Sequence, residues 1–114
     1  MSNKVIFGEI DWNWKGSEIV KFIKAFSNPY DYAFTYLKNK KNKKNKKIFI
    51  KNGKFKKTLS HPFLIGKIFQ YNSQNKSIKV FTNDGFLTIK SKDLVINNKK
   101  TSLSSLEGNY FIKE

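Results

Sequence analysis

The stretch that decides the fold is IDWNWKGSEIVKFIKAFSNPYDYAFTYL, residues 10–37. Its apolar residues recur at the three-and-four spacing of one helix face: Ile19, Val20, Ile23 and Phe26. This spacing predicts a short amphipathic helix from Ser17, the expected N-cap, to Phe26. Pro29 disfavours the helical conformation of the residue before it, so the helix should end by residue 27 or 28. The aromatic and β-branched residues at 32–37 then predict a strand.

The remainder of the chain alternates short apolar runs with turn residues. Strands are predicted at 48–50, within 63–71, at 77–82, at 86–90 and at 93–96, and a single helical turn at 102–106. Asn52-Gly53 favours a tight hairpin to Phe55, although an irregular connection is the alternative. One helix followed by five or six short strands indicates a mainly β domain, a small closed or nearly closed antiparallel barrel.

These features resemble the formyltransferase C-terminal domain. That domain follows the catalytic domain in methionyl-tRNA formyltransferase and in formyltransferases acting on amino-sugars of nucleotide sugars. The resemblance begins with Ile-Asp-Trp at 10–12, the helix ending near Ala25, the Asn-Pro-Tyr turn at 28–30 and the following strand. It continues through segments 48–51, 62–68, 78–82, 86–89 and 98–106, and so spans about residues 9–111.

The resemblance implies an OB-like barrel with one N-terminal helix, in which residues 1–9 are the lead-in or linker. It also implies a non-catalytic accessory domain that binds the formyl acceptor, an amino-sugar nucleotide or an aminoacyl-tRNA. The partner would be a formyltransferase catalytic domain, supplied in cis or in trans. The sequence departs locally from the family pattern at two places. Lys24 replaces the arginine of the family's Arg-Ala pair, and three residues separate Pro62 from Gly66 where the family has Pro-Gly-x-Ile.

Catalytic residues are not predicted. The family's catalytic domain uses an Asn, a His in a His-Pro-Ser context and an Asp around formyl-folate, and this chain lacks that domain. Ser-His-Pro-Phe at 60–63 resembles the context only locally, and we interpret His61 as a strand-entry residue. The acidic residues are scattered and form no acid/base pair. With one histidine and no cysteine, neither a cofactor nor a metal site is expected.

The composition indicates a single domain over residues 1–114 in a reducing compartment, most simply the cytoplasm. There is no signal-peptide core and no apolar run long enough to span a membrane. The 23 lysines against 8 acidic residues give a net charge of +15, which favours a polyanionic partner such as tRNA or a nucleotide-sugar phosphate. However, Lys, Asn, Ile and Phe supply 59 of the 114 residues, so drift toward AT-rich codons explains the lysines equally well.

Lysine is densest between Lys38 and Lys57, where 11 lysines occur without an acid. Residues 38–47 are predicted to form a lysine-rich hairpin loop. Such a run is either a solvated loop or a contact for phosphates. An OB-like barrel binds polyanions through a basic groove and aromatic platforms. The candidate binding residues are Trp14, Lys21, Lys24, Tyr30, Tyr36, Lys40, Lys41, Lys43 and Lys44.

The aromatic candidates have a structural alternative, since small barrels need bulky side chains inside. Of the two tryptophans, one is expected in the core, and the family resemblance implies that it is Trp12. Trp14 is then the candidate for an exposed stacking or interdomain contact, although both could simply cover the helix. A second class of function is also open. The chain could be a free-standing basic OB-like domain that binds RNA or single-stranded nucleic acid without sequence preference.

Overall fold

The structure, a computed structural model, describes residues 8–26, 32–38, 46–59, 62–96 and 103–113. Within these residues the chain is mainly β with one N-terminal helix, as predicted. The elements are α1 (Gly16–Ala25), β1 (Ala33–Leu37), β2 (Lys46–Ile50), β3 (Lys54–Lys57), β4 (Ile68–Asn72), β5 (Ser77–Phe81), β6 (Gly85–Lys90), β7 (Leu94–Ile96) and β8 (Phe111–Ile112), with 3-10 turns η1 (Pro62–Leu64), η2 (Ser91–Asp93) and η3 (Leu103–Leu106). The expected five or six strands were too few, because β3 and β8 were not predicted.

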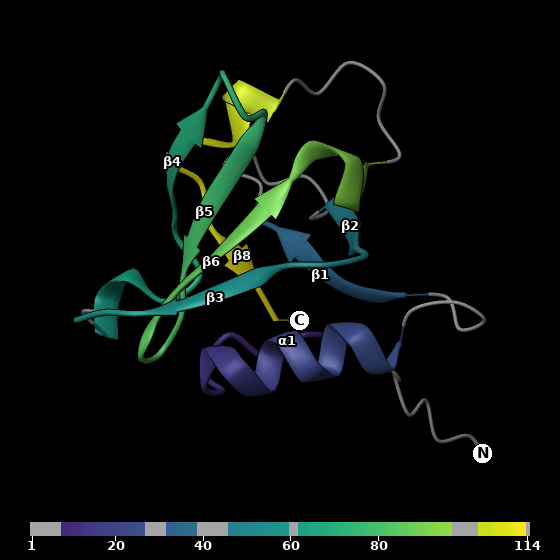
Figure 1. The fold of residues 1–114 in the computed structure, drawn as a ribbon, viewed down its shortest axis with the longest axis vertical. Coiled ribbons are helices and arrows are strands. Elements are labelled where there is room, and N and C mark those ends of the chain that lie inside the picture. The colour runs from purple at the N-terminus through teal and green to yellow at the C-terminus, as the bar shows by residue number, and fades with distance from the viewer. Residues whose placement is uncertain (1–7, 27–31, 39–45, 60–61, 97–102, 114) are drawn as a thin grey trace.

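The strands form two four-stranded antiparallel sheets. The first has the order β7-β2-β1-β8 and the second the order β3-β6-β5-β4 (Figure 1). In the first sheet Leu37 pairs with Lys46, so β1 and β2 are neighbouring antiparallel strands on either side of the lysine-rich segment. Strand β2 already includes Lys46 and Lys47, at the end of the predicted loop. Residues 39–45 lie outside the described residues.

The prediction of a closed or nearly closed barrel is confirmed only as antiparallel sheets, because no closed barrel is detected among the described residues. The two sheets do meet along one seam, where Lys67 forms an antiparallel bridge with Tyr110. There the Phe111 amide donates to the Gly66 carbonyl at 2.7 Å. Gly66 has φ +87°, and a Cβ on it would lie 2.3 Å from the Phe111 oxygen, so the seam requires glycine. At the other ends of the two sheets, β3 and β7 do not pair with each other.

The connection between β2 and β3 is not the tight hairpin that Asn52-Gly53 favours. Strand β2 pairs with β1 and β7, whereas β3 pairs with β6 in the other sheet. The chain therefore crosses between sheets here, and the alternative of an irregular connection is correct. The Asn52 side-chain oxygen accepts a hydrogen bond from the Gly53 amide at 2.9 Å, a local use typical of asparagine in turns.

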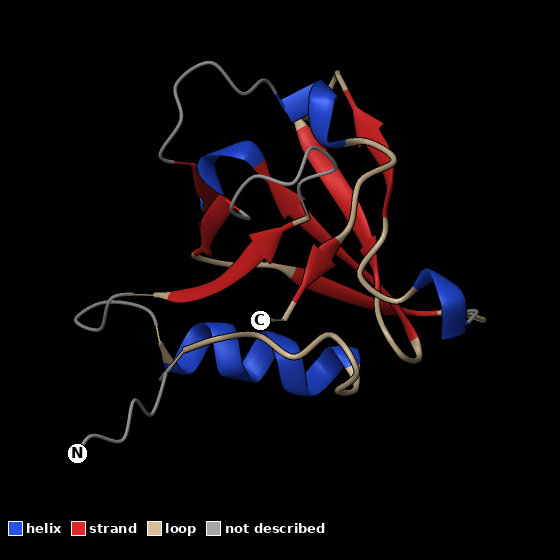
Figure 2. Cartoon of the chain, turned by 180° about the vertical axis from the view of Figure 1, so that it is seen from behind, coloured by secondary structure: helices blue, strands red, loops and turns tan. Residues whose placement is uncertain are grey.

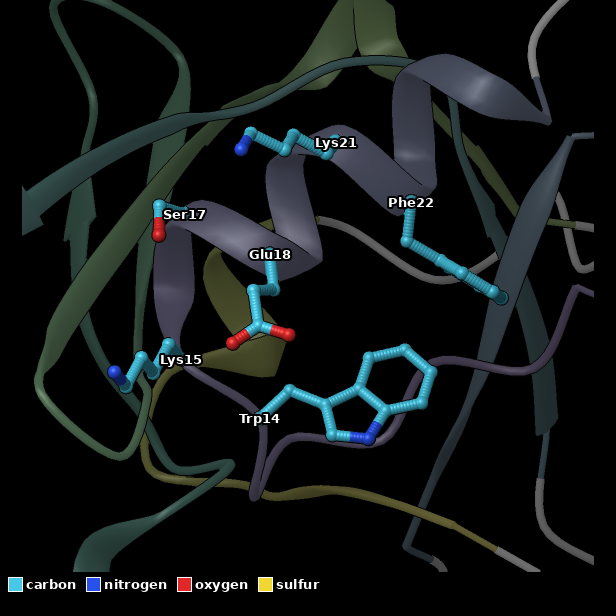
Figure 3. A pocket seen from close by; sticks show the side chains of 6 residues that line it. All are labelled: Trp14, Lys15, Ser17, Glu18, Lys21 and Phe22. Carbon is cyan, nitrogen blue, oxygen red and sulfur yellow. The ribbon is translucent and has the colours of Figure 1, made fainter.

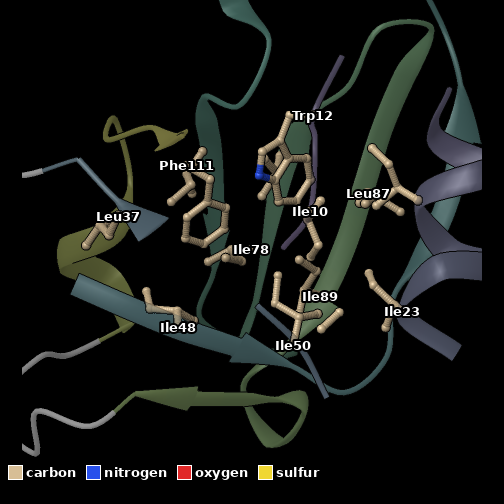
Figure 4. Close-up of a cluster of buried hydrophobic side chains, with 14 of the residues drawn as sticks. Ile10, Trp12, Ile23, Leu37, Ile48, Ile50, Ile78, Leu87, Ile89 and Phe111 are labelled. Carbon is tan, nitrogen blue, oxygen red and sulfur yellow. The ribbon is translucent and has the colours of Figure 1, made fainter. Parts of the chain in front are cut away.

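The core lies between the two sheets and the helix (Figure 4). Strand alternation places one residue in two on the inner faces, and α1 adds Ile19 and Ile23 from its apolar face. The buried hydrophobic residues are Ile10, Trp12, Ile19, Ile23, Ala33, Phe34, Leu37, Ile48, Ile50, Ile68, Ile78, Val80, Leu87, Ile89, Leu106 and Phe111. The short β8, although unpredicted, thus contributes one of the large core rings.

Trp12 is a core residue, as predicted. Its ring stacks on Phe111, with 5.5 Å between centroids, and its Nε1 donates a 2.9 Å hydrogen bond to the Thr35 hydroxyl. That hydroxyl in turn donates to the carbonyl of Ile112 at 3.3 Å. The buried indole N–H and the threonine side chain therefore both have partners, which a dry core requires.

Helix α1 runs back along the segment that precedes it and lies below the strands (Figures 1 and 2). The prediction of Ser17 as the N-cap was wrong. The N-cap is Lys15, which makes no side-chain capping bond, and the helix already includes Gly16. The Gly16 amide instead donates to Asp84 Oδ1 at 2.9 Å. The carboxylate of a distant hairpin turn therefore satisfies a first-turn donor that a local hydroxyl was expected to satisfy.

The predicted turns and later strands are largely confirmed. Asn72 ends β4 and accepts hydrogen bonds from the amides of Gln74 and Asn75, which closes the turn into β5. The turn before Gly85 joins β5 to β6, and the predicted helical turn at 102–106 corresponds to η3. The run at 63–71 is only partly a strand, since η1 precedes β4 and a register shift interrupts β4 between Ile68 and Gln70. His61 lies outside the described residues.

Candidate binding site

A shallow groove lies on the solvent side of α1 and the turn before it. Its volume is about 700 Å³, and it is lined by Trp14, Lys15, Ser17, Glu18, Lys21 and Phe22 (Figure 3). Two rows of helix residues form its floor, Ser17 with Lys21 and Glu18 with Phe22, each four residues apart. The groove therefore brings together two of the predicted binding residues, Trp14 and Lys21.

Trp14 forms the aromatic wall of this groove. It is half-buried, and its ring meets Phe22 edge to face with 5.0 Å between centroids. The Phe22 ring in turn packs against the Phe26 ring, with 4.7 Å between their centroids. Trp14 therefore covers part of the helix and also presents part of its indole to solvent. An indole fixed in this way can stack on a flat or ring-shaped ligand without losing much conformational freedom.

The charged residues of the groove have complementary chemistry. Lys15 and Lys21 are exposed ammonium groups that can bind phosphate as point charges. Glu18 extends from α1 toward the indole of Trp14 and can accept hydrogen bonds from hydroxyl or ammonium groups (Figure 3). The lining thus offers a stacking surface, an acceptor and two cations to one ligand.

Tyr36 lies on a separate surface, the outer face of the first sheet. Its ring meets Phe34 edge to face at 5.7 Å, and Phe34 meets Phe49 at 6.1 Å. Lys47 Nζ lies 4.1 Å from the centroid of Phe34 and 5.1 Å from that of Phe49, which are cation–π distances. We call these four residues the sheet aromatic face. Sequence reasoning missed three of them, although Phe34 and Tyr36, like Lys47 and Phe49, stand two apart in a strand and so share one face.

Of the other predicted binding residues, only Lys24 is among the described residues, and it lines neither surface. Lys24 is an exposed residue in the last turn of α1, where a cation interacts favourably with the helix dipole. Tyr30, Lys40, Lys41, Lys43 and Lys44 lie outside the described residues. The segment containing these four lysines joins the ends of β1 and β2, the two strands that carry the sheet aromatic face.

The described residues contain no group of three or more His, Cys, Asp or Glu side chains that could hold a metal ion. None of the helices described is long and apolar enough to cross a membrane.

Taken together, the fold is a small, lysine-rich, mainly β domain with a surface suited to binding. The sequence matches the family described as formyl transferase, C-terminal domain, over residues 4–106. This chain belongs to that family. A comparison with curated proteins finds no match. The family's catalytic domain is not detected in this chain, and a C-terminal domain of this kind implies association with a formyltransferase catalytic domain.

Proposed function

We propose that this chain is the non-catalytic acceptor-binding domain of a formyltransferase, and that the groove on α1 binds the acceptor. The acceptor is an amino-sugar nucleotide or an aminoacyl-tRNA, both of which combine sugar hydroxyls with phosphates. The single observation that carries the proposal is that Trp14, Glu18 and Lys21 line one groove. These side chains match a ring, a hydroxyl or amine donor, and a phosphate.

In this proposal the chain positions the acceptor while a catalytic domain, in cis or in trans, transfers the formyl group. The seam at Gly66 and Phe111 joins the two sheets, and α1 packs against them, so the groove sits on a rigid support. Binding energy gained at a remote accessory site can hold the acceptor amine near the reacting centre. We expect the domain chiefly to lower the KM for the acceptor.

Tryptophan fluorescence of the intact chain tests acceptor binding directly. Trp12 is 3% exposed, so a response to added tRNA or nucleotide sugar would come from Trp14. Lys21→Gln should weaken binding several-fold, whereas Lys56→Gln, an exposed lysine on β3, should leave it unchanged with the same loss of charge. Trp14→Phe should abolish the response. Equal effects of the two lysine substitutions would overturn the assignment to the groove.

Association with a catalytic domain needs a second measurement. A formyltransferase catalytic domain lacking its own C-terminal domain is assayed with and without this chain. A lower KM for the acceptor, reversed by Lys21→Gln, supports the proposal. If the KM is unchanged when this chain is present at a saturating concentration, action in trans is contradicted. A fusion of the catalytic domain to this chain then tests action in cis.

The sheet aromatic face favours a second candidate, a free-standing domain that binds RNA or single-stranded nucleic acid without sequence preference. Tyr36 and Phe49 are the partly exposed rings of this face, whereas Phe34 is only 4% exposed and supports them from below. Partly exposed rings with a nearby cation can act as a stacking platform for single strands. A surface whose cations are all lysines binds phosphates as point charges and discriminates little between bases. Tyr36→Ala would weaken oligonucleotide binding in this case and leave nucleotide-sugar binding intact.

A further inference from the structure

A second hollow lies where the chain crosses from the first sheet to the second. Its volume is about 150 Å³, and it is lined by Asn52, Gly53, Lys54, Thr88, Lys90, Lys92 and Asp93. It shares no residue with the groove on α1. Three of its side chains are ammonium groups and one is a carboxylate, so the lining carries a net charge of +2.

The strand register explains why the lysines converge. Lys54 is the direct antiparallel partner of Thr88 on β6. On β6 the burial alternates, so Thr88 and Lys90 share the outer face while Leu87 and Ile89 point into the core. Lys92 follows in η2. Side chains directly and diagonally opposite in such a ladder lie within reach of one another.

The backbone around the hollow is held in place. The Lys51 amide donates to the Asp93 carbonyl at 2.7 Å, which fixes the crossover against η2. The Ser91 amide donates to the Lys76 carbonyl at 2.8 Å, which fixes the end of β6 against the turn before β5. The lysines therefore extend from a preformed frame, and a ligand need not order it.

Like charges gathered at one hollow repel one another unless an anion joins them. Within the described residues, none of the ammonium groups of Lys54, Lys90 and Lys92 forms an ion pair. Asp93 lines the same hollow without reaching any of them within 4.0 Å. A ligand with two or more negative charges would relieve this repulsion, and lysine is a common partner of phosphate.

We propose that this hollow, the crossover pocket, binds the phosphate groups of a phosphorylated ligand. At about 30 Å³ for each displaced water, its volume equals that of about five waters. That space suits one or two phosphoryl groups, and the remainder of a larger ligand would lie outside. The inference goes beyond acceptor binding at the α1 groove and does not depend on it.

The test titrates the whole chain with inorganic pyrophosphate and follows the backbone amide resonances of Gly53, Thr88 and Lys92. Lys90→Gln with Lys92→Gln should weaken pyrophosphate binding at least tenfold. The matched control, Lys56→Gln with Lys57→Gln, removes the same charge from exposed positions on β3 and should change binding less than twofold. Absence of binding by the parent chain, or equal losses in the two double variants, would overturn the proposal.

Substitution of Asp93 should strengthen pyrophosphate binding, whereas the lysine substitutions should weaken it. Asp93→Asn removes the one carboxylate of the pocket, and pyrophosphate should then bind about two- to five-fold more tightly, as expected for a partly exposed charge. Glu107→Gln makes the same change of charge at an exposed position outside both hollows and keeps an acceptor oxygen for the Tyr71 amide, so it should have no effect. Tightening by Glu107→Gln as strong as that by Asp93→Asn would show a net-charge effect and overturn the site.

Two sources of phosphate remain to be distinguished, a diphosphate of a small molecule and the backbone of RNA. Uridine diphosphate and a 12-nucleotide single-stranded RNA are added in competition with pyrophosphate. Displacement by uridine diphosphate alone assigns the pocket to a nucleotide ligand, and displacement by the RNA assigns it to a backbone. Failure of both to displace pyrophosphate would mean that the pocket takes only a free inorganic ion, against the proposal.

Discussion

The Asp84 carboxylate accepts a hydrogen bond from the Gly16 amide at 2.9 Å and so caps α1 from the turn between β5 and β6. A neighbouring contact reinforces it, since the Asn83 side-chain nitrogen donates to the Asn13 carbonyl at 2.9 Å. A Cβ on Gly16 would lie 2.0 Å from the Phe55 ring, so the helix start fits against β3 closely. These contacts fix the end of α1 from which the groove opens.

Asp84→Ala should therefore destabilise the whole domain. Loss of a helix-capping side chain costs about 0.5–2 kcal/mol, and a carboxylate at a helix N-terminus also interacts favourably with the helix dipole. Denaturant unfolding measures the change. Asp84→Asn keeps an acceptor oxygen and should retain most of the stability. An alanine variant as stable as the parent would contradict the capping role.

Much of the secondary structure could be predicted because it depends on neighbouring residues. The helical spacing of apolar residues such as Ile19 and Ile23 predicted α1. The turn residues before Gly85 predicted the hairpin formed by β5 and β6. The cap could not be predicted, because Asp84 lies 68 positions from Gly16 and no local pattern connects them. The short β8 lacks any alternation of its own and depends on pairing with β1.

The candidate sites likewise combine residues that could be predicted from local sequence with contacts that depend on the tertiary structure. Trp14 and Lys21 could be singled out as an aromatic and a cation on one amphipathic segment. The pairing of Trp14 with Phe22 needs the turn that reverses the chain before α1. The crossover pocket depends on the register that sets Lys54 beside Thr88, and a one-residue slip would move these side chains to the other face.

Gly66→Ala should disrupt the seam between the sheets. Gly66 and Gly108 both have φ +87°, which strains any other residue, but only at Gly66 would a Cβ meet the backbone, 2.3 Å from the Phe111 oxygen. Gly108→Ala, with nothing within 4 Å, isolates the conformational cost of about 1–2 kcal/mol. We expect Gly66→Ala to lose clearly more stability in thermal unfolding. Equal losses would show that the close approach at the seam is unimportant.

The isolated chain should not transfer a formyl group. The family's catalytic domain is not detected here, and the sequence predicts no acid/base pair among its scattered acidic residues. The chain is incubated with 10-formyltetrahydrofolate and amine acceptors, and formylated product is measured by mass spectrometry. His61→Ala is the control, since His61 is the only histidine. Product formed by the parent above that of the control would refute this prediction.

The lysine-rich segment between β1 and β2 gives the last prediction, because codon drift and phosphate contact differ in their dependence on salt. Each lysine engaged on a single strand releases counterions, so log K against log salt should have a slope of about −0.7 per contact. About four engaged lysines would give a slope near −3. Replacing Lys40, Lys41, Lys43 and Lys44 with Gln should flatten this slope and weaken RNA binding by tens-fold.

The control for that change replaces four lysines elsewhere, so that net charge falls equally. Lys56, Lys57, Lys76 and Lys113 are exposed and lie outside the groove, the sheet aromatic face and the crossover pocket. Attraction by overall charge is screened beyond about 8 Å at physiological salt, so the control should bind nearly as well as the parent. If both variants lose the same affinity, the segment acts only through net charge. If neither does, its lysines reflect codon drift, and the phosphate contacts belong to the helix groove or the crossover pocket.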